Sequence, residues 1–99
     1  MVLELAILEV RPGQESDFET AFREALAIIQ SMPGYRSHEL GRCVEKASRY
    51  VLLVRWERLE DHTEGFRGSA EYERWRALLH HFYEVFPDVE HYRSVFSAS

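Results

Sequence analysis

The five histidines are the residues with the clearest capacity for chemistry, because imidazole exchanges protons near neutral pH. His62 follows Trp56 by six residues, at the expected start of a helical segment, where it could cover a cavity. The alternative for His62 is a surface position beside Asp61. His81 borders an apolar helical stripe and could reach the same cavity. Its neighbour His80 is expected on the polar side of that helix, in solvent.

The spacing of the histidines and the single cysteine does not match a zinc or iron site. His80 and His81 are adjacent, so on a helix their side chains point about 100° apart and cannot share one metal without distortion. His38 and His91 belong to segments expected at opposite edges of a sheet. Cys43 has no partner for a disulfide and is expected to be structural. The sequence therefore predicts no metal, and it contains no phosphate-binding or dinucleotide-binding motif.

Aromatic side chains are the second feature with functional potential, since the chain has two tryptophans, five tyrosines and six phenylalanines. They form core by default, but they can also line an apolar pocket for a flat ligand. Arg76 lies one residue beyond an apolar stripe and could direct its guanidinium at an anionic ligand. The alternative is a surface ion pair of Arg76 with Glu73 or Glu84. The candidate pocket residues are Trp56, Phe66, Tyr72 and Trp75.

The apolar pattern predicts the elements that must position these residues, because strands repeat every two residues and helices every three to four. Strands are expected over Val2–Val10, Tyr35–Cys43, Arg49–Glu57 and Val89–Phe96. Helices are expected over Glu15–Met32, over Leu59–Arg67 as a short turn, and from the N-cap Ser69 to Phe86, before Pro87. The order βαββαβ predicts one α+β domain over residues 1–99 with a ferredoxin-like fold. That fold places two helices on one face of a four-stranded antiparallel sheet.

Both faces of the two central strands are apolar, which predicts a homodimer. In the first strand Leu3, Leu5 and Ile7 face away from the other apolar residues, and in the third strand Val51 and Leu53 do the same. A sheet with one wet face should alternate apolar and polar residues, and two helices can cover only one face. Monomers rarely expose so large an apolar patch, so two copies are expected to pack their sheets about a two-fold axis. The alternative is a monomer with a few exposed apolar residues.

Composition excludes several classes of protein. The 99 residues are 45% apolar and 29% charged, as in soluble globular proteins. The formal net charge is −5 and the basic residues are scattered, so nucleic acid is not an expected partner. The apolar N-terminal run contains Glu4 and Glu9 and lacks a basic start, unlike a signal peptide. No apolar run approaches the roughly 20 residues of a membrane span, and a single cysteine favours a reduced, cytoplasmic location.

The segment VLLVRWERLEDHTEGFRGSAEYERWRALL, from Val51 to Leu79, resembles the signature half of antibiotic biosynthesis monooxygenase domains. Those domains show an apolar strand ending in W-E, a helical stretch, and S-x-x-[YF] opening the last helix. The MPGY of Met32–Tyr35 and the RPGQ of Arg11–Gln14 resemble two of their turns, so the likeness spans essentially the whole chain. The resemblance implies a dimeric α+β barrel with a pocket between sheet and helices in each subunit.

Some members of this family degrade haem, so the resemblance raises the question of whether this chain could cleave haem. Those members use an asparagine on the first strand, a tryptophan before the last helix and a histidine within it. An ungapped match places Ala6, Phe66 and Arg76 at these positions, and all three differ. The resemblance therefore disfavours haem cleavage by this chain.

Quinone-forming members of the family oxidise aromatic polyketides without a cofactor. A tryptophan and a helical arginine of theirs match Trp56 and Arg76, whereas their pocket asparagine and tyrosine fall at Leu52 and His62. Our hypothesis for the mechanism is that a phenol or hydroquinone loses a proton to a base, with His62 and His81 as the candidates, while Trp56 and Phe66 hold the ring. Arg76 would stabilise the anion, which reacts with oxygen without flavin or metal. The alternative is a non-catalytic dimer that binds a small molecule or haem.

Overall fold

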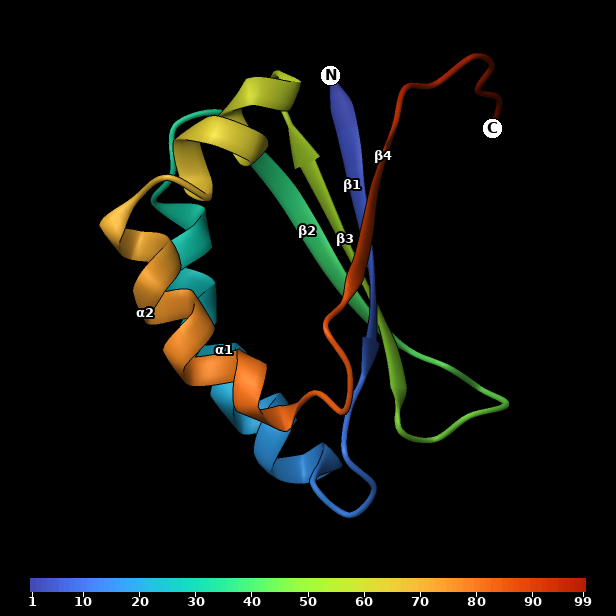
Figure 1. The fold of residues 1–99 in the computed structure, drawn as a ribbon. Coiled ribbons are helices and arrows are strands. Elements are labelled where there is room, and N and C mark those ends of the chain that lie inside the picture. Colours follow the sequence, from blue (N-terminus) through green and yellow to red (C-terminus); the bar gives the residue numbers. More distant parts are fainter.

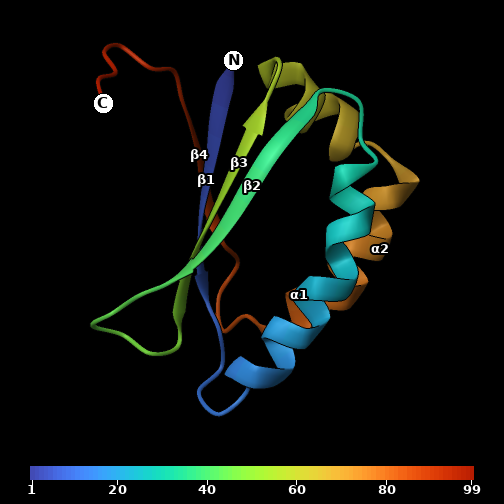
Figure 2. The same cartoon turned by 180° about the vertical axis from the view of Figure 1, so that it is seen from behind.

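The computed structural model describes residues 1–99 and confirms the βαββαβ order. The strands are β1 (Val2–Glu9), β2 (Tyr35–Arg42), β3 (Arg49–Trp56) and β4 (Asp88–Tyr92). The helices are α1 (Glu15–Gln30) and α2 (Ala70–Leu79), with a π-helical turn η1 (Asp61–Phe66) and a 3₁₀ turn η2 (His80–Phe82). The four strands form one antiparallel sheet in the order β2-β3-β1-β4. Both helices lie on the same face of this sheet, which confirms the ferredoxin-like fold (Figures 1 and 2).

The core lies between the helices and the inner face of the sheet. In β1 and β3 alternate residues point at the helices and are buried, as the period of a strand requires. The apolar stripe of α1 packs onto them through Phe18, Phe22, Ala25 and Ile29, all of which are buried. Sixteen buried residues make one hydrophobic cluster, and Trp56 at the end of β3 is among its largest fully buried side chains.

A tight turn between α1 and β2 supports the segment that follows β3. Gly34 has φ +85°, and a Cβ added there would lie 2.1 Å from Oδ2 of Asp61. The carbonyl of Gly34 accepts a hydrogen bond from the backbone N–H of Glu57 at 2.8 Å. Asp61 in turn accepts from the backbone N–H of Arg58 at 3.0 Å. This close approach fixes where η1 begins, and therefore where His62 is placed.

The C-terminal helix is shorter than predicted. It was expected to continue to Phe86, but α2 ends at Leu79 and tightens into the 3₁₀ turn η2. The physical reason is pairing with the sheet, since Tyr83 forms an antiparallel bridge with Val10 and draws the backbone out of the helix. Phe86 is consequently exposed rather than part of the core stripe.

The remaining boundaries differ from the predictions by one or two residues, except at the last strand. That strand was expected to reach Phe96 but ends at Tyr92, and the apolar side chains of Val95 and Phe96 are exposed. It ends where its pairing with β1 ends, at the Leu3–Tyr92 pair. No helix is both long enough and apolar enough to cross a lipid bilayer.

Both helices lie on one side of the sheet and leave its outer face uncovered (Figure 1), and this face carries an apolar strip. Leu5 is paired with Leu53, and Ile7 with Val51, across the β1–β3 ladder. These four side chains and Leu3 are only half-buried. The prediction that both faces of the central strands are apolar is thus confirmed for the single chain.

Candidate functional site

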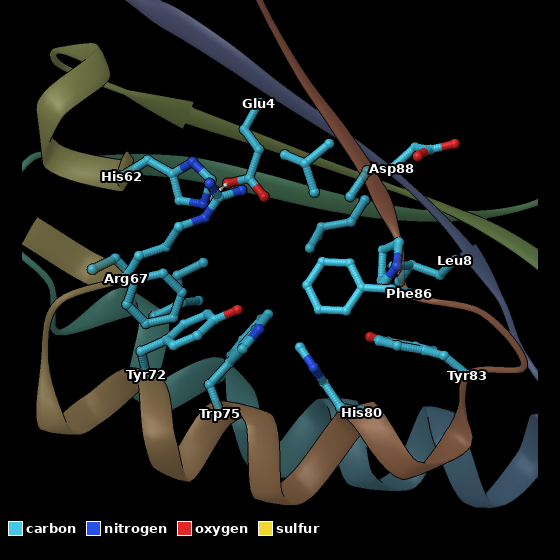
Figure 3. A pocket seen from close by; sticks show the side chains of 16 residues that line it. Glu4, Leu8, His62, Arg67, Tyr72, Trp75, His80, Tyr83, Phe86 and Asp88 are labelled. Atoms are coloured by element: carbon cyan, nitrogen blue, oxygen red, sulfur yellow. Dashed lines mark ion pairs between the residues drawn. The ribbon is translucent and has the colours of Figure 1, made fainter. Parts of the chain in front are cut away.

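A cavity of about 390 Å³ lies between the inner face of the sheet and the helical layer (Figure 3). Sixteen residues line it, ten of them hydrophobic, from β1, β3, β4, both helices and the turns around α2. Ligand pockets in proteins typically enclose about 300–1,000 Å³ and combine apolar walls with a few polar groups. The size and lining of this cavity therefore suit a small, flat organic molecule.

The carboxyl group of Glu4 lies in the cavity wall, on the inner face of β1, and is almost fully buried. Its Oε1 accepts a hydrogen bond from the indole Nε1–H of Trp56 at 2.9 Å. Burial raises the pKa of Glu4 to about 7, although the Trp56 hydrogen bond and the charge of Arg67 act in the opposite direction. A buried carboxyl that changes charge near neutral pH can accept and return a proton, and such groups concentrate at functional sites.

His62 lies beside Glu4, on the π-helical turn η1. The backbone N–H of Arg67 donates to the His62 carbonyl five residues earlier at 3.1 Å, which is the bond that defines a π-helix. The imidazole stacks on Trp56, with the ring centroids 5.5 Å apart, and its Nδ1 lies 2.8 Å from Nε2 of His91. Its Nε2 lies 3.4 Å from Oε1 of Glu4.

The contact between His62 and Glu4 joins a neutral imidazole to a carboxyl group. Burial lowers the pKa of His62 to about 3, with smaller contributions from Arg67 and His91. At neutral pH the ring is therefore uncharged, and the contact is not an ion pair. A neutral ring has one nitrogen that donates and one that accepts, so His62 can hold a proton on either side.

Arg67 is the positively charged residue at the end of the cavity that contains Glu4 and His62. Its side chain lies beside Glu4 and His62 and points into the cavity (Figure 3). No carboxylate lies within 4.0 Å of its guanidinium, unlike Arg76, whose Nη1 lies 3.5 Å from Glu73. Although Arg67 as a whole is exposed, its unpaired guanidinium borders a largely apolar cavity and is suited to an anionic oxygen of a ligand.

The opposite end of the cavity is formed by His80, Tyr83, Phe86 and Asp88 (Figure 3). His80 was expected in solvent, and the structure corrects this, because the ring is half-buried and lines the cavity. The reason is the 3₁₀ turn, which begins at His80 and redirects the chain towards the sheet. Burial, followed by the charge of Arg76, lowers the pKa of His80. Burial raises the pKa of Tyr83.

Four of the residues predicted from the sequence line the cavity together. His62 is joined by three aromatic rings from η1 and α2, namely Phe66, Tyr72 and Trp75. Phe66 is central, since its ring centroid lies 5.2 Å from that of Tyr72 and 5.6 Å from that of Trp75, both edge-on. Ser69 caps α2 as predicted, because its Oγ accepts from the backbone N–H of Tyr72 at 3.1 Å.

The other three predicted residues lie outside the cavity. Trp56 is fully buried behind the wall, where it contacts the ring of His62 and the carboxyl of Glu4. Arg76 follows Trp75 in α2, so it points about 100° away from it and is exposed. The side chain of His81 is also exposed. The structure therefore does not bring Arg76 or His81 together with His62.

Sequence reasoning missed Glu4 and Arg67 as site residues. Glu4 did carry a signal, because it is in phase with Val2, Ala6 and Leu8, so its carboxyl must face the core. Arg67 carried none, since it follows η1 and its direction depends on how that turn meets the sheet. No group of three or more His, Cys, Asp or Glu side chains is arranged to hold a metal ion.

The model of the family described as antibiotic biosynthesis monooxygenase matches residues 1–78. The uncharacterized protein YczJ of Bacillus subtilis (strain 168) is 57% identical to this chain over 95 residues, which cover 96% of this chain and 100% of YczJ.

Solved structures agree with the family match. The crystal structure of a Bordetella bronchiseptica protein named after the same family matches this chain with a TM-score of 0.93 and 34% sequence identity. The match covers 96% of this chain and 97% of the Bordetella chain. The crystal structure of SnoaB, a cofactor-independent oxygenase from Streptomyces nogalater, matches with a TM-score of 0.84 and 18% sequence identity. That match covers 97% of this chain and 94% of the SnoaB chain. The likeness to SnoaB extends to the fold alone.

Proposed function

Because the chain belongs to the antibiotic biosynthesis monooxygenase family, we propose that it is a cofactor-independent monooxygenase. Its substrate is an electron-rich aromatic, a phenol or hydroquinone, which it oxidises to a quinone in the cavity between sheet and helices. SnoaB, which has the same fold, is an oxygenase that works without a cofactor. Similar folds host unrelated functions, so the proposal rests on the chemistry of the cavity.

The observation that carries the proposal is the buried carboxyl of Glu4 at one end of a cavity lined with aromatic rings. With a pKa near 7, this group is a general base matched to neutral pH. Arg67 lies next to it and can stabilise the oxygen anion that forms when a phenol loses its proton. Phe66 and Trp75 supply the faces and edges that hold the ring.

These residues differ in part from those expected from the sequence. Glu4 takes the role of base that was expected of His62 or His81, because His81 is exposed and His62 is too weak a base to retain a proton. Arg67 takes the role expected of Arg76, which is paired with Glu73 in solvent. We propose that Trp56 acts by holding Glu4 in place.

The reaction balances with molecular oxygen as the only co-substrate. A phenol gives its hydroxyl proton to the Glu4 carboxylate, and the phenolate passes one electron to O₂. The phenoxyl radical and superoxide then combine to form a C–O bond at the para carbon. The peroxide takes the proton back from Glu4, the O–O bond breaks, and water leaves with the hydrogen of the para carbon. One oxygen atom ends in the quinone and the other in water, so no flavin, metal or external reductant is consumed.

Isotope labelling tests this proposal. The protein is incubated under ¹⁸O₂ with one-, two- and three-ring phenols, and the products are analysed by mass spectrometry. We expect one ¹⁸O atom in the quinone, and loss of at least about 100-fold in rate for Glu4→Gln, since a general base contributes roughly 10²–10⁴. The matched control is Glu24→Gln, which removes an exposed carboxyl from α1.

Two outcomes would count against monooxygenation. A hydroquinone converted to an unlabelled quinone with release of hydrogen peroxide would indicate an oxidase. Binding of phenols without oxygen uptake would favour the alternative of a ligand-binding protein. A titration with haem, followed by its visible absorption, tests the haem-binding form of that alternative.

We also propose that two copies pack through the outer faces of their sheets. The support is the uncovered apolar strip of Leu3, Leu5, Ile7, Val51 and Leu53. Introducing a charge there should separate the copies, because a buried unpaired carboxylate is costly. We expect Leu5→Glu to halve the mass measured by light scattering at micromolar concentration. Ala27→Glu, on the exposed side of α1, is the control. A wild-type protein that is monomeric at this concentration would end the dimer proposal.

A further inference from the structure

Three titratable side chains form a continuous chain from the cavity to the edge of the sheet. Oε1 of Glu4 lies 3.4 Å from Nε2 of His62, and Nδ1 of His62 lies 2.8 Å from Nε2 of His91. Glu4 and His91 are paired residues of β1 and β4, and His62 reaches over both from η1. The two nitrogens of His62 thus face different partners, one in the cavity wall and one at the sheet edge.

The outer end of this chain reaches solvent. β4 is an edge strand, and His91 is only half-buried. Nδ1 of His91 has no hydrogen-bond partner in the protein, and no buried side-chain nitrogen or oxygen lacks a partner, so this atom is in contact with solvent. The inner end, Glu4, is almost fully buried and lines the cavity.

We propose that Glu4, His62 and His91 form a proton relay that lets Glu4 exchange protons with solvent while a ligand fills the cavity. The inference rests on the proposed function in one respect, which is that Glu4 acts as the base. A bound aromatic ring would exclude water from Glu4, so a carboxyl that is already protonated when the ligand enters could not act as a base without another route for its proton.

The proton movement is balanced over the three groups. Protonated Glu4 gives its proton to Nε2 of His62, while Nδ1–H of His62 passes its proton to Nε2 of His91. Nδ1–H of His91 then releases a proton to water. Both rings remain neutral and end in their other tautomer, with Glu4 again a carboxylate. The tautomers return to the starting form when the next proton passes in the opposite direction or when the rings exchange protons with solvent.

Arg67 is the charged group that faces all three members of the relay. After burial, its charge is the next contribution that lowers the pKa of His62 and of His91, and it also favours the carboxylate form of Glu4. A positive charge at this place disfavours an imidazolium on either ring. A proton is therefore passed through the relay without being trapped on it.

Substitutions of His91 separate a relay from a purely structural contact. His91→Gln keeps an N–H that can donate to Nδ1 of His62, but an amide cannot accept a proton on one side and release it on the other. His91→Phe keeps a ring and removes both nitrogens. The control is His38→Gln, on the opposite edge strand, where the histidine contacts Tyr35.

We expect both His91 variants to lower kcat about 10-fold at pH 6 with KM unchanged, because about nine in ten Glu4 carboxyls are then protonated when substrate binds. Both variants should also enlarge the solvent deuterium isotope effect. Added imidazole should restore kcat in a concentration-dependent way, since it replaces the missing proton carrier. Equal kcat for wild type and both variants would overturn the relay. Full activity of His91→Gln beside loss in His91→Phe would also overturn it, in favour of a positioning role for His91.

A measurement without turnover distinguishes failure of the relay from failure of the proposed function. The ¹⁵N spectrum of the histidine rings is recorded with a fluorinated phenol that resists oxidation bound in the cavity. The relay predicts a neutral His62 that exchanges between both tautomers in the wild type and is locked in one tautomer in His91→Phe. A single fixed tautomer in the wild type would refute the relay, even if quinone formation is observed. Exchange without any oxygen uptake would support the relay and refute only the monooxygenase.

Discussion

The indole of Trp56 donates a hydrogen bond to the carboxyl of Glu4 at 2.9 Å, diagonally across the β1–β3 ladder. Trp56 is paired with Val2, and Glu4 with Val54, so the bond joins diagonal neighbours on the inner face. The same indole stacks on the imidazole of His62. One buried tryptophan therefore contacts both Glu4 and His62 without lining the cavity itself.

Trp56→Phe is expected to raise the pKa of Glu4 above its value of about 7, because the indole hydrogen bond favours the carboxylate. The pKa can be followed by ¹³C NMR of labelled glutamate carboxyl groups during a pH titration. The base should then become active only at higher pH, so the acid limb of the rate profile shifts in the same direction. Trp75→Phe, which leaves this hydrogen bond in place, is the control. An unchanged or lower pKa in Trp56→Phe would contradict the assignment.

Glu4→Gln is expected to change how stability depends on pH. The pKa of Glu4 is about 7 in the folded protein, above its ordinary value of 4.5, so the folded state binds this proton more tightly than the unfolded state. The stabilisation by protonated Glu4 is complete below pH 4.5 and is lost as the pH rises through 7. Relative to wild type, Glu4→Gln should gain stability over this range, by about 1–3 kcal/mol at pH 8.

Urea unfolding at pH 5, 6, 7 and 8 measures this difference in stability. The amide oxygen of the variant can still accept the hydrogen bond of Trp56, so the comparison isolates the charge. Glu24→Gln provides the matched exposed substitution. A difference between Glu4→Gln and wild type that stays constant from pH 5 to pH 8 would show that Glu4 is not strained as a carboxylate.

Arg67→Gln and Arg76→Gln separate the structural assignment of the anion site from the one expected from the sequence. We expect Arg67→Gln to weaken binding of an acidic phenol about 10-fold, which corresponds to roughly 1.4 kcal/mol. Arg76→Gln should leave affinity within about twofold, since surface ion pairs contribute little and Arg76 lies outside the cavity. Dissociation constants can be measured by calorimetry. A larger loss of affinity for Arg76→Gln than for Arg67→Gln would assign the anion site to Arg76 instead.

Gly34→Ala is expected to destabilise the protein more than Gly13→Ala. Both glycines have positive φ, at +85° and +89°, so each substitution places alanine in a left-handed conformation that costs about 1–2 kcal/mol. Only at Gly34 does the added Cβ meet another group, Asp61, whereas nothing lies within 4 Å of it at Gly13. The clash should add about 1–3 kcal/mol.

The two glycine variants are compared by thermal and urea unfolding. Displacement of Asp61 also moves the start of η1, so Gly34→Ala should reduce ligand affinity in the protein that remains folded. Equal losses in the free energy of unfolding for the two variants would contradict the prediction, because they would show that Asp61 moves away from the added Cβ without an energetic cost.

The sequence by itself determined the order of elements, the antiparallel sheet and the apolar character of both faces of the central strands. These features follow from the period of the apolar residues and from proline and glycine, which act over a few neighbouring residues. The aromatic lining of Phe66, Tyr72 and Trp75 was predictable for the same reason, since a helical stripe that faces the sheet can also face a cavity.

Only the tertiary structure decided which polar groups share the cavity. Glu4, His62, Arg67 and His91 come from β1, η1, the segment after it and β4, so their proximity depends on how these elements meet in space. The choice of Arg67 over Arg76 depends on the path of a π-helical turn, and the inclusion of His80 depends on the early end of α2. The pKa values that make Glu4 a base and keep His62 neutral arise from burial, which is a property of the packed molecule and not of any local stretch of sequence.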